Sequence, residues 1–208
     1  MIKHYKKQIQ NINPVEQGFM FKSKNWDFDT SLLSRIASDG DIITRKMIVE
    51  KFEHYYKNNQ NTDFRIPFLC TMIWGFGNAG YGSFRTKKYL EEENTDKIKA
   101  ALDFMDKNQV EKAFHKLMSI SGLGISFTSK VLHFAGKAKG ENYPLIFDIR
   151  VANALVMLLD KKIASMLAVM PVQKWETYNA YNEMLHQWAK EHSVEADQIE
   201  LFLFNQAM

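Results

Sequence analysis

The stretch from Ser119 to Gly136, "SISGLGISFTSKVLHFAG", decides the fold of this chain. An amphipathic segment precedes it, Gly122 and Gly124 bracket Leu123, and a second helical segment begins at once. Glycine allows the unusual backbone angles of a tight reversal and lets exposed amides approach a partner closely. The pattern therefore predicts two helices joined by a hairpin. A helix that ends at a glycine and is followed by an unrelated helix would give the same letters.

The hairpin is also a candidate phosphate site. The amides that follow the turn head a helix, and the positive end of a helix attracts anions. We expect the backbone around Gly122, Leu123, Gly124 and Ser126 to supply these amides. The helix-hairpin-helix motif is predicted over about residues 109–136.

Lys130 occupies an unusual position in the second helix of this motif. On a helical wheel Phe127, Val131 and Phe134 lie together, and Lys130 lies at the edge of their apolar face, on the side of Ser126. A lysine at such a border can extend to water, or it can remain in a semi-apolar cleft. In a cleft, loss of solvation favours the neutral amine, which is a nucleophile.

Asp148 is the second candidate for chemistry, because it ends the apolar run "YPLIFD" and precedes the helical segment 148–159. An aspartate in that place is typically a helix N-cap. Capping fixes one carboxylate oxygen and leaves the other available. Asp148 follows Lys130 by 18 positions, which is enough to finish one helix and return along a loop, so both groups can face one cleft.

The rest of the chain indicates an all-α fold, because apolar residues recur at three- and four-residue spacing. Asp29 and Thr30 are candidate N-caps of one helix and Thr44 of the next, and Pro67 must lie in the first turn of its helix. We expect two lobes with a cleft between them, meeting near residues 75–105. The predicted helices cover residues 30–38, 45–59, 63–74, 95–105, 109–120, 125–136, 148–159, 171–191 and 195–204.

Composition limits the classes of function. The longest apolar runs are too short to span a bilayer and the N-terminus lacks the apolar core of a signal peptide, so we expect a soluble, cytoplasmic protein without membrane partners. One cysteine, Cys70, cannot supply the thiolates of an iron–sulfur cluster, and the histidines lack zinc-site spacing, so no metal or cofactor is implied. A net charge of +3 allows DNA binding only through a local basic face.

Weaker candidates surround these motifs. The loop "GFGNAGYG" contains Gly75 and Gly77, whose backbone could approach a bound base, although a structural turn is the favoured explanation of the glycines. Nearby basic groups that could contact phosphate are Arg150, Lys137 and Lys139. The possible stacking aromatics are Trp26, Trp74, Tyr81, Phe202 and Phe204, of which Phe202 and Phe204 are favoured.

Taken in order, the hairpin, Lys130, the return loop with Pro144 and the capping Asp148 resemble the helix-hairpin-helix DNA glycosylases with the "GPD" signature. "GLGISFTSKVLHF" and "PLIFDIRVANAL" are most similar to a bacterial branch related to 8-oxoguanine DNA glycosylases. In bifunctional members the lysine comes two residues after the second glycine, where Ser126 stands here, and Lys130 lies one helical turn later. The resemblance covers residues 109–159 closely and implies a single helical domain over residues 1–208.

The resemblance implies an enzyme that extrudes a damaged purine from DNA, such as 8-oxoguanine, and excises it. Lys130 would attack the sugar and form a Schiff base that breaks the strand by β-elimination, while Asp148 would stabilise the cationic sugar. Two alternatives remain open. One is a monofunctional glycosylase for another modified base, and the other is a non-enzymatic module that binds DNA or a protein.

Overall fold

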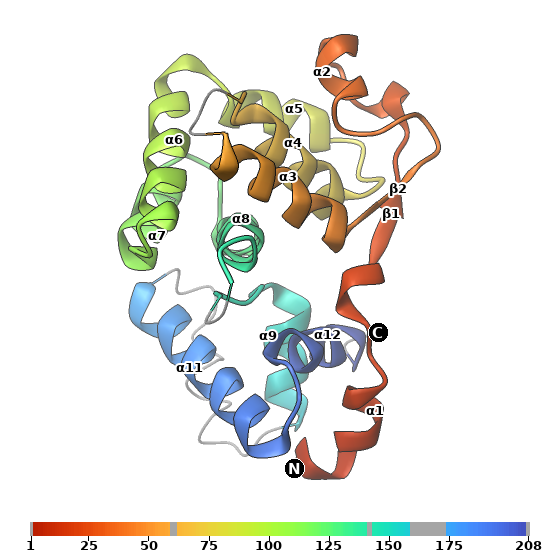
Figure 1. The fold of residues 1–208 in the computed structure, drawn as a ribbon, viewed down its shortest axis with the longest axis vertical. Coiled ribbons are helices and arrows are strands. Elements are labelled where there is room, and N and C mark those ends of the chain that lie inside the picture. The colour runs from red at the N-terminus through yellow and green to blue at the C-terminus, as the bar shows by residue number, and fades with distance from the viewer. Residues whose placement is uncertain (1, 59–61, 141–142, 159–173, 207–208) are drawn as a thin grey trace.

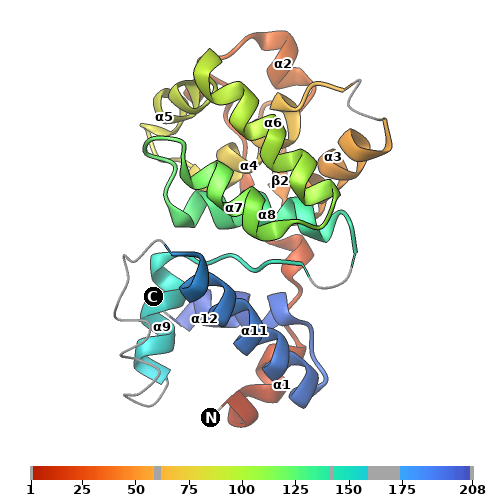
Figure 2. The same cartoon turned by 90° about the vertical axis from the view of Figure 1, so that its left-hand side faces the viewer.

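The computed structural model describes residues 2–58, 62–140, 143–158 and 174–206. These residues form helices in two lobes, with a small two-stranded sheet at one side (Figures 1 and 2). The predicted all-α fold is confirmed. No helix in the described parts of the chain has the length and apolar character needed to cross a membrane.

The first lobe comprises residues 18–140. Its antiparallel strands pair Gly18 with Thr44 and Met20 with Ile42, and a short 3-10 helix, η3, covers Ser23–Asn25. The strands and helices of this lobe are β1 (Gly18–Met20), α2 (Thr30–Ser34), β2 (Ile42–Thr44), α3 (Arg45–Lys57), α4 (Arg65–Phe76), α5 (Gly82–Tyr89), α6 (Glu92–Asp106), α7 (Val110–Met118) and α8 (Ile125–Lys137).

The second lobe combines the two ends of the chain (Figure 2). Its helices are η1 (Ile2–Tyr5), α1 (Lys6–Gln10), α9 (Ile149–Leu158), α11 (Trp175–His192) and α12 (Ala196–Gln206), and η2 (Pro14–Glu16) contacts both α3 and α12. The chain crosses between the lobes at about residues 11–17 and 143–148 (Figure 2). Within the range 75–105, where we expect the lobes to meet, Gly75, Phe76, Ala79 and Tyr81 line a cavity between the lobes, whereas α5 and α6 belong to the first lobe. Periodicity identifies helices but not the neighbours against which they pack.

Local signals account for most helix starts. Asp29 Oδ1 accepts from the amides of Ser31 and Leu32, and Thr44 Oγ1 accepts from the amide of Met47. Pro67 is the third residue of α4, in its first turn, as predicted. The predicted helix 30–38 is shorter in the structure and ends at Ser34. Residues 59, 159 and 171–173, where three predicted helices end or begin, lie outside the described residues.

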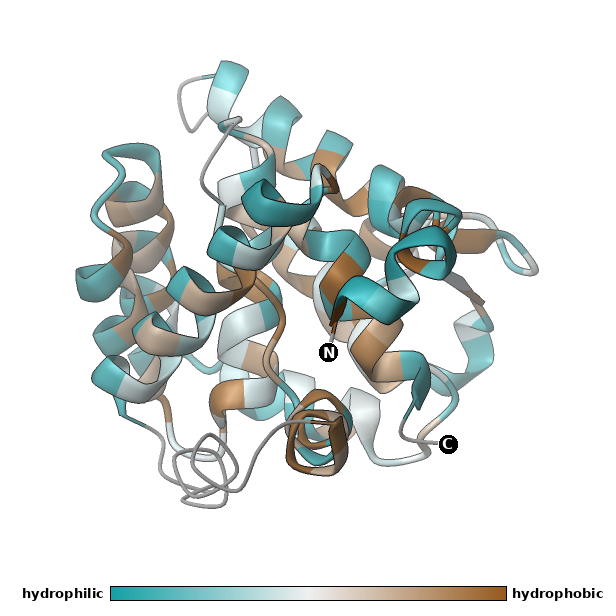
Figure 3. Cartoon of the chain, turned by 90° about the horizontal axis from the view of Figure 1, so that it is seen from below, coloured by the Kyte–Doolittle hydropathy of each residue, from teal (hydrophilic) through white to brown (hydrophobic). Residues whose placement is uncertain are grey.

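Helix α8 lies at the centre of the molecule, between α3, α4, α6 and α7 on one side and the second lobe on the other (Figure 1). Most other helices carry both hydrophobic and hydrophilic residues, as expected for amphipathic helices around a core (Figure 3). Nearly every side chain of α8 is buried, and this includes Lys130 and His133. A helix in this place brings charged groups into the interior, where they need partners.

Candidate active site

The helix-hairpin-helix motif is present. Helices α7 and α8 pack together, and Gly122 between them has φ +80°, a left-handed conformation that glycine adopts without strain. The Tyr89 hydroxyl at the end of α5 donates to the Gly122 carbonyl at 2.8 Å. Leu123 is buried, and its amide donates to Ile120. Gly124 is the N-cap of α8, so the amides of the first turn of this helix follow the hairpin directly.

Lys130 lies in the interior rather than extending to water, with only 5% of its surface exposed. Its Nζ donates to the Ser126 hydroxyl at 2.9 Å and to the Ser126 carbonyl at 3.2 Å, and it lies 5.3 Å from the centre of the Phe127 ring. Burial lowers the pKa of the Lys130 amine, and the nearby Asp148 carboxylate opposes that shift only in part. The environment therefore favours the neutral amine more than water does.

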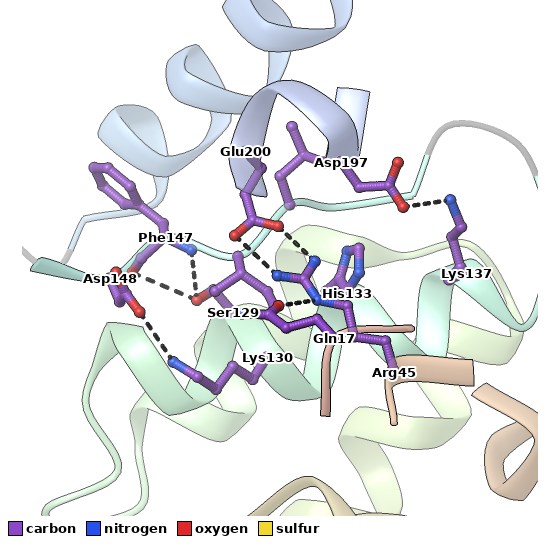
Figure 4. Close-up of polar contacts among 12 residues, drawn as sticks. Gln17, Arg45, Ser129, Lys130, His133, Lys137, Phe147, Asp148, Asp197 and Glu200 are labelled. Carbon is purple, nitrogen blue, oxygen red and sulfur yellow. Dashed lines mark hydrogen bonds and ion pairs between the residues drawn. The ribbon is translucent and has the colours of Figure 1, made fainter. Parts of the chain in front are cut away.

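Asp148 caps α9 and faces Lys130, as the sequence predicts. Its Oδ1 accepts from the amides of Arg150 at 3.0 Å and Val151 at 3.2 Å. Its Oδ2 lies 3.5 Å from the Lys130 Nζ (Figure 4). The capping bonds fix the carboxylate, so one oxygen holds the helix while the other faces the amine.

The buried segment from Tyr143 to Asp148 carries the aspartate into place. It forms neither helix nor strand, so its backbone groups need side-chain partners. Helices α8 and α11 supply them. The contacts are Tyr143 O with His186, Pro144 O with His133, Leu145 N with Asn182, Leu145 O with Tyr178, Ile146 O with Tyr181, and Phe147 N with Ser129.

Lys130 and Asp148 line a cavity of about 320 Å³ between the two lobes, within the size range of small-molecule sites. The other predicted residues in its wall are Gly75, Ser126, Arg150 and Phe204, together with the candidate aromatics Trp74 and Tyr81. Two larger hollows, of about 600 and 710 Å³, lie elsewhere and contain none of the predicted site residues.

A buried ion pair forms another part of the cavity wall. Arg45, the first residue of α3, donates from Nη1 to Glu200 Oε2 at 2.6 Å and from Nη2 to Oε1 at 3.3 Å, and its Nε donates to Gln17 Oε1 at 2.7 Å (Figure 4). The guanidinium lies 5.3 Å from the centre of the Trp74 ring. Burial raises the pKa of the Glu200 carboxyl, and Arg45 opposes that rise.

Several predicted residues lie outside the cavity wall. Phe202 is buried against Tyr5, and Trp26 is buried against Phe28 and Phe76. Gly77 ends α4 with φ +54°, and a Cβ there would meet the ring of Phe19, which does line the cavity.

The candidate phosphate-binding cations differ in their surroundings. Lys137 donates to Asp197 at 2.7 Å and lies over the ring of Tyr143, while Lys139 donates to Asp106 at 2.6 Å. Arg150 lies at the cavity with its guanidinium 4.5 Å from the centre of the Phe204 ring. Of these three cations, only Arg150 is near Lys130 and Asp148.

Sequence reasoning missed Gln17, Arg45 and Glu200. A signal existed for Glu200, because it interrupts the apolar run "IELFLF" four residues before Phe204, and residues four apart share a helix face. Gln17 and Arg45 carry no comparable signal. Among the described residues, no group of three or more His, Cys, Asp or Glu side chains is arranged to hold a metal ion.

Comparison with known proteins agrees with this arrangement. A family model described as "Putative 8-oxoguanine DNA glycosylase OGG-like protein" matches residues 13–204. No curated protein and no solved structure gives a significant match to the chain. The matched range includes the hairpin, Lys130, Asp148 and the whole cavity wall, and it confirms the resemblance read from those motifs. The chain therefore belongs to this OGG-like family.

Proposed function

We propose that the protein is a bifunctional DNA glycosylase and AP lyase that excises an oxidised purine, with Lys130 as nucleophile and Asp148 as the assisting carboxylate. The observation that carries the proposal is the 3.5 Å approach of the Lys130 Nζ to Asp148 Oδ2 inside a cavity between the lobes. A structural lysine would more often extend to water. A buried amine at the wall of a cavity can instead meet a substrate atom.

The cavity suits a flat, polar-edged ring system. Trp74, Phe127 and Phe204 supply aromatic surface, while Gln17 and Glu200 supply polar atoms. A purine extruded from DNA is read by stacking on its faces and by hydrogen bonds to its edges.

The proposed reaction begins with attack by Lys130. The neutral Lys130 amine attacks C1′ of the extruded nucleotide, the C1′–N9 bond breaks, and the base leaves with the bonding pair and takes up a proton. The amine then loses a proton, the C1′–O4′ bond opens, and a Schiff base forms. Loss of a proton from C2′ expels the 3′ phosphate, which breaks the strand.

Asp148 acts through its charge. Departure of the base gives the sugar ring cationic character, and a fixed carboxylate close to it stabilises that charge. Because the capping bonds to Arg150 and Val151 already hold Asp148, little reorganisation is needed during the reaction.

Borohydride trapping on duplex DNA that contains 8-oxoguanine tests the proposal. The wild type is expected to form a covalent complex and to release the base. Lys130→Gln is expected to lose the covalent complex, and Asp148→Asn to lose excision while it still binds DNA. Lys137→Gln is the matched control, because Lys137 lies on the same helix and also pairs with an aspartate, and it is expected to trap like the wild type.

The other possible results would support the alternative functions. Base release without a covalent complex, retained in Lys130→Gln, would indicate a monofunctional glycosylase. DNA binding without excision of 8-oxoguanine or of any other modified base in a panel would contradict the enzymatic proposal.

A further inference from the structure

We propose that the outer face of α5 is a DNA-binding surface that holds the strand leading into the cavity. The surface consists of Tyr81, which precedes α5, and of Phe84, Arg85 and Lys88 within it. This inference rests on the proposed function, because it assumes that DNA delivers a nucleotide to the cavity. It adds a contact surface beyond the hairpin and Arg150.

The aromatic side chains of this surface are unusually exposed. Phe84 is 62% exposed and Tyr81 is 58% exposed, whereas most large aromatic residues of the chain lie in its core. They lie three residues apart, which places them on neighbouring positions of one helical face. Single exposed apolar side chains are common, but a pair of this kind at the mouth of a cavity marks a contact surface.

Cations accompany both rings. The Arg85 guanidinium lies 5.8 Å from the centre of the Tyr81 ring, and the Lys88 ammonium lies 4.7 Å from the centre of the Phe84 ring. Helix α5 contains no acidic residue. Its third cation, Lys87, is paired with Asp27. The run Glu91–Glu93 follows at the start of α6 and limits the basic surface on that side.

The position of α5 connects the two parts of the proposed DNA site. Tyr81 at its beginning lines the cavity, and Tyr89 at its end donates to Gly122 in the hairpin. Figure 2 shows α5 directly beside the loop between α7 and α8. A strand with one nucleotide in the cavity and its phosphates at the hairpin therefore passes along α5.

The chemistry of the surface favours nucleic acid over a protein partner. Cationic groups neutralise phosphates, and aromatic faces stack on bases or pack on sugars, a combination typical of proteins that track a single DNA strand. The overall charge of +3 is too small to hold DNA by itself, so a local basic face is needed.

The test measures binding of undamaged duplex and single-stranded DNA by fluorescence anisotropy at several salt concentrations. Arg85→Ala with Lys88→Ala is expected to weaken duplex binding at low salt at least about 10-fold and to reduce the salt slope by about 2, since each phosphate contact contributes about 0.9. Phe84→Ala is expected to weaken single-strand binding about 5-fold or more, with the slope unchanged.

The matched control is Lys57→Ala with Lys107→Ala, which removes the same charge from the far end of the first lobe. Lys107 caps the end of α6 opposite α5, about 20 Å away by helix rise, and Lys57 ends α3. This control is expected to bind within about 2-fold of the wild type, because Lys57 and Lys107 belong neither to the cavity wall nor to the hairpin that the DNA is proposed to contact.

If the Arg85 and Lys88 variant keeps the wild-type affinity and salt slope, the proposed surface is contradicted. An equal loss of affinity in the control would also contradict it, because the loss would then depend on the total charge of the protein and not on α5. Unchanged single-strand binding by Phe84→Ala would overturn the aromatic part. Excision is measured separately. Binding through α5 without excision contradicts only the proposed function, while excision with unaffected α5 variants contradicts only this surface.

Discussion

At the scale of a single residue, two opposing effects act on the pKa of the Lys130 amine. Burial favours its neutral amine, and the Asp148 carboxylate 3.5 Å away favours the ammonium. Burial has the larger effect, so the pKa of the amine is lowered. The protonation of the Lys130 amine therefore depends on Asp148 as well as on burial.

The rate of covalent trapping is therefore expected to rise with pH, with a midpoint below the ordinary lysine pKa of about 10.4. In Asp148→Asn the midpoint is expected to move lower still, because the carboxylate that raises the pKa of Lys130 is gone, while the maximal rate falls about 100-fold. Single-turnover trapping over a pH series measures both. A midpoint that stays in place or moves upward in Asp148→Asn would contradict this coupling.

Gly75 positions Lys130 by leaving room for it. A Cβ on Gly75 would lie 2.7 Å from the edge of the Phe127 ring and 3.1 Å from Lys130 Cδ. Gly75→Ala is expected to displace both side chains and to slow covalent trapping about 10-fold or more, because small misplacement of a reacting group is costly. DNA affinity should stay within about 2-fold, since phosphate contacts dominate affinity.

Gly80→Ala provides the control for Gly75→Ala, because nothing lies within 4 Å of a Cβ at that position. It should trap at the wild-type rate. Equal trapping by the two alanine variants would show that Gly75 has no positioning role.

At the scale of elements, the segment Tyr143–Asp148 explains why the capping aspartate meets α8. Its backbone groups bond to side chains of α8 and α11, so its path is set by tertiary contacts. Within this set, the Pro144 carbonyl can only accept a hydrogen bond. The Nδ1 of His133 must therefore carry a proton, and the buried ring is neutral.

Burial lowers the pKa of His133 to about 3, so the unfolded chain binds a proton between pH 6.5 and 3 that the folded protein does not. Stability contributed by this group is thus complete above pH 6.5 and is lost as pH falls. Between pH 7 and pH 5, His133→Asn is expected to lose about 2 kcal/mol less unfolding free energy than the wild type. Urea unfolding at both pH values measures this difference, and parallel losses would contradict it.

The sequence predicts where helices begin better than it predicts the course of the segments that connect them. Asp29, Thr44 and Asp148 cap helices as expected, because an N-cap depends on neighbours in the chain. Helix α5 was not predicted, since "GFGNAGYG" suggests a loop up to its first residue. The buried course of residues 143–148 could not be predicted, because its partners lie up to 43 residues away in the chain.

At the scale of the whole molecule, the two lobes meet across side chains that are distant in sequence. Arg45 begins α3 in the first lobe, and Glu200 lies on α12 in the second, 155 residues later. Lys130 and Asp148 could be predicted to meet because a short return connects them. The Arg45–Glu200 pair could not, because no local pattern links a buried arginine to a carboxylate so far along the chain.

The buried pair links the lobes energetically. Arg45 is 3% exposed and Glu200 is fully buried, so removing either partner leaves an uncompensated charge in the interior. We expect Arg45→Met or Glu200→Gln alone to lower the free energy of unfolding by about 3 kcal/mol or more. The double variant buries neither charge, so it should lose about 2 kcal/mol less than the sum of the single losses. Urea unfolding of the four proteins gives the coupling, and additive losses would mean that this ion pair does not couple the two lobes.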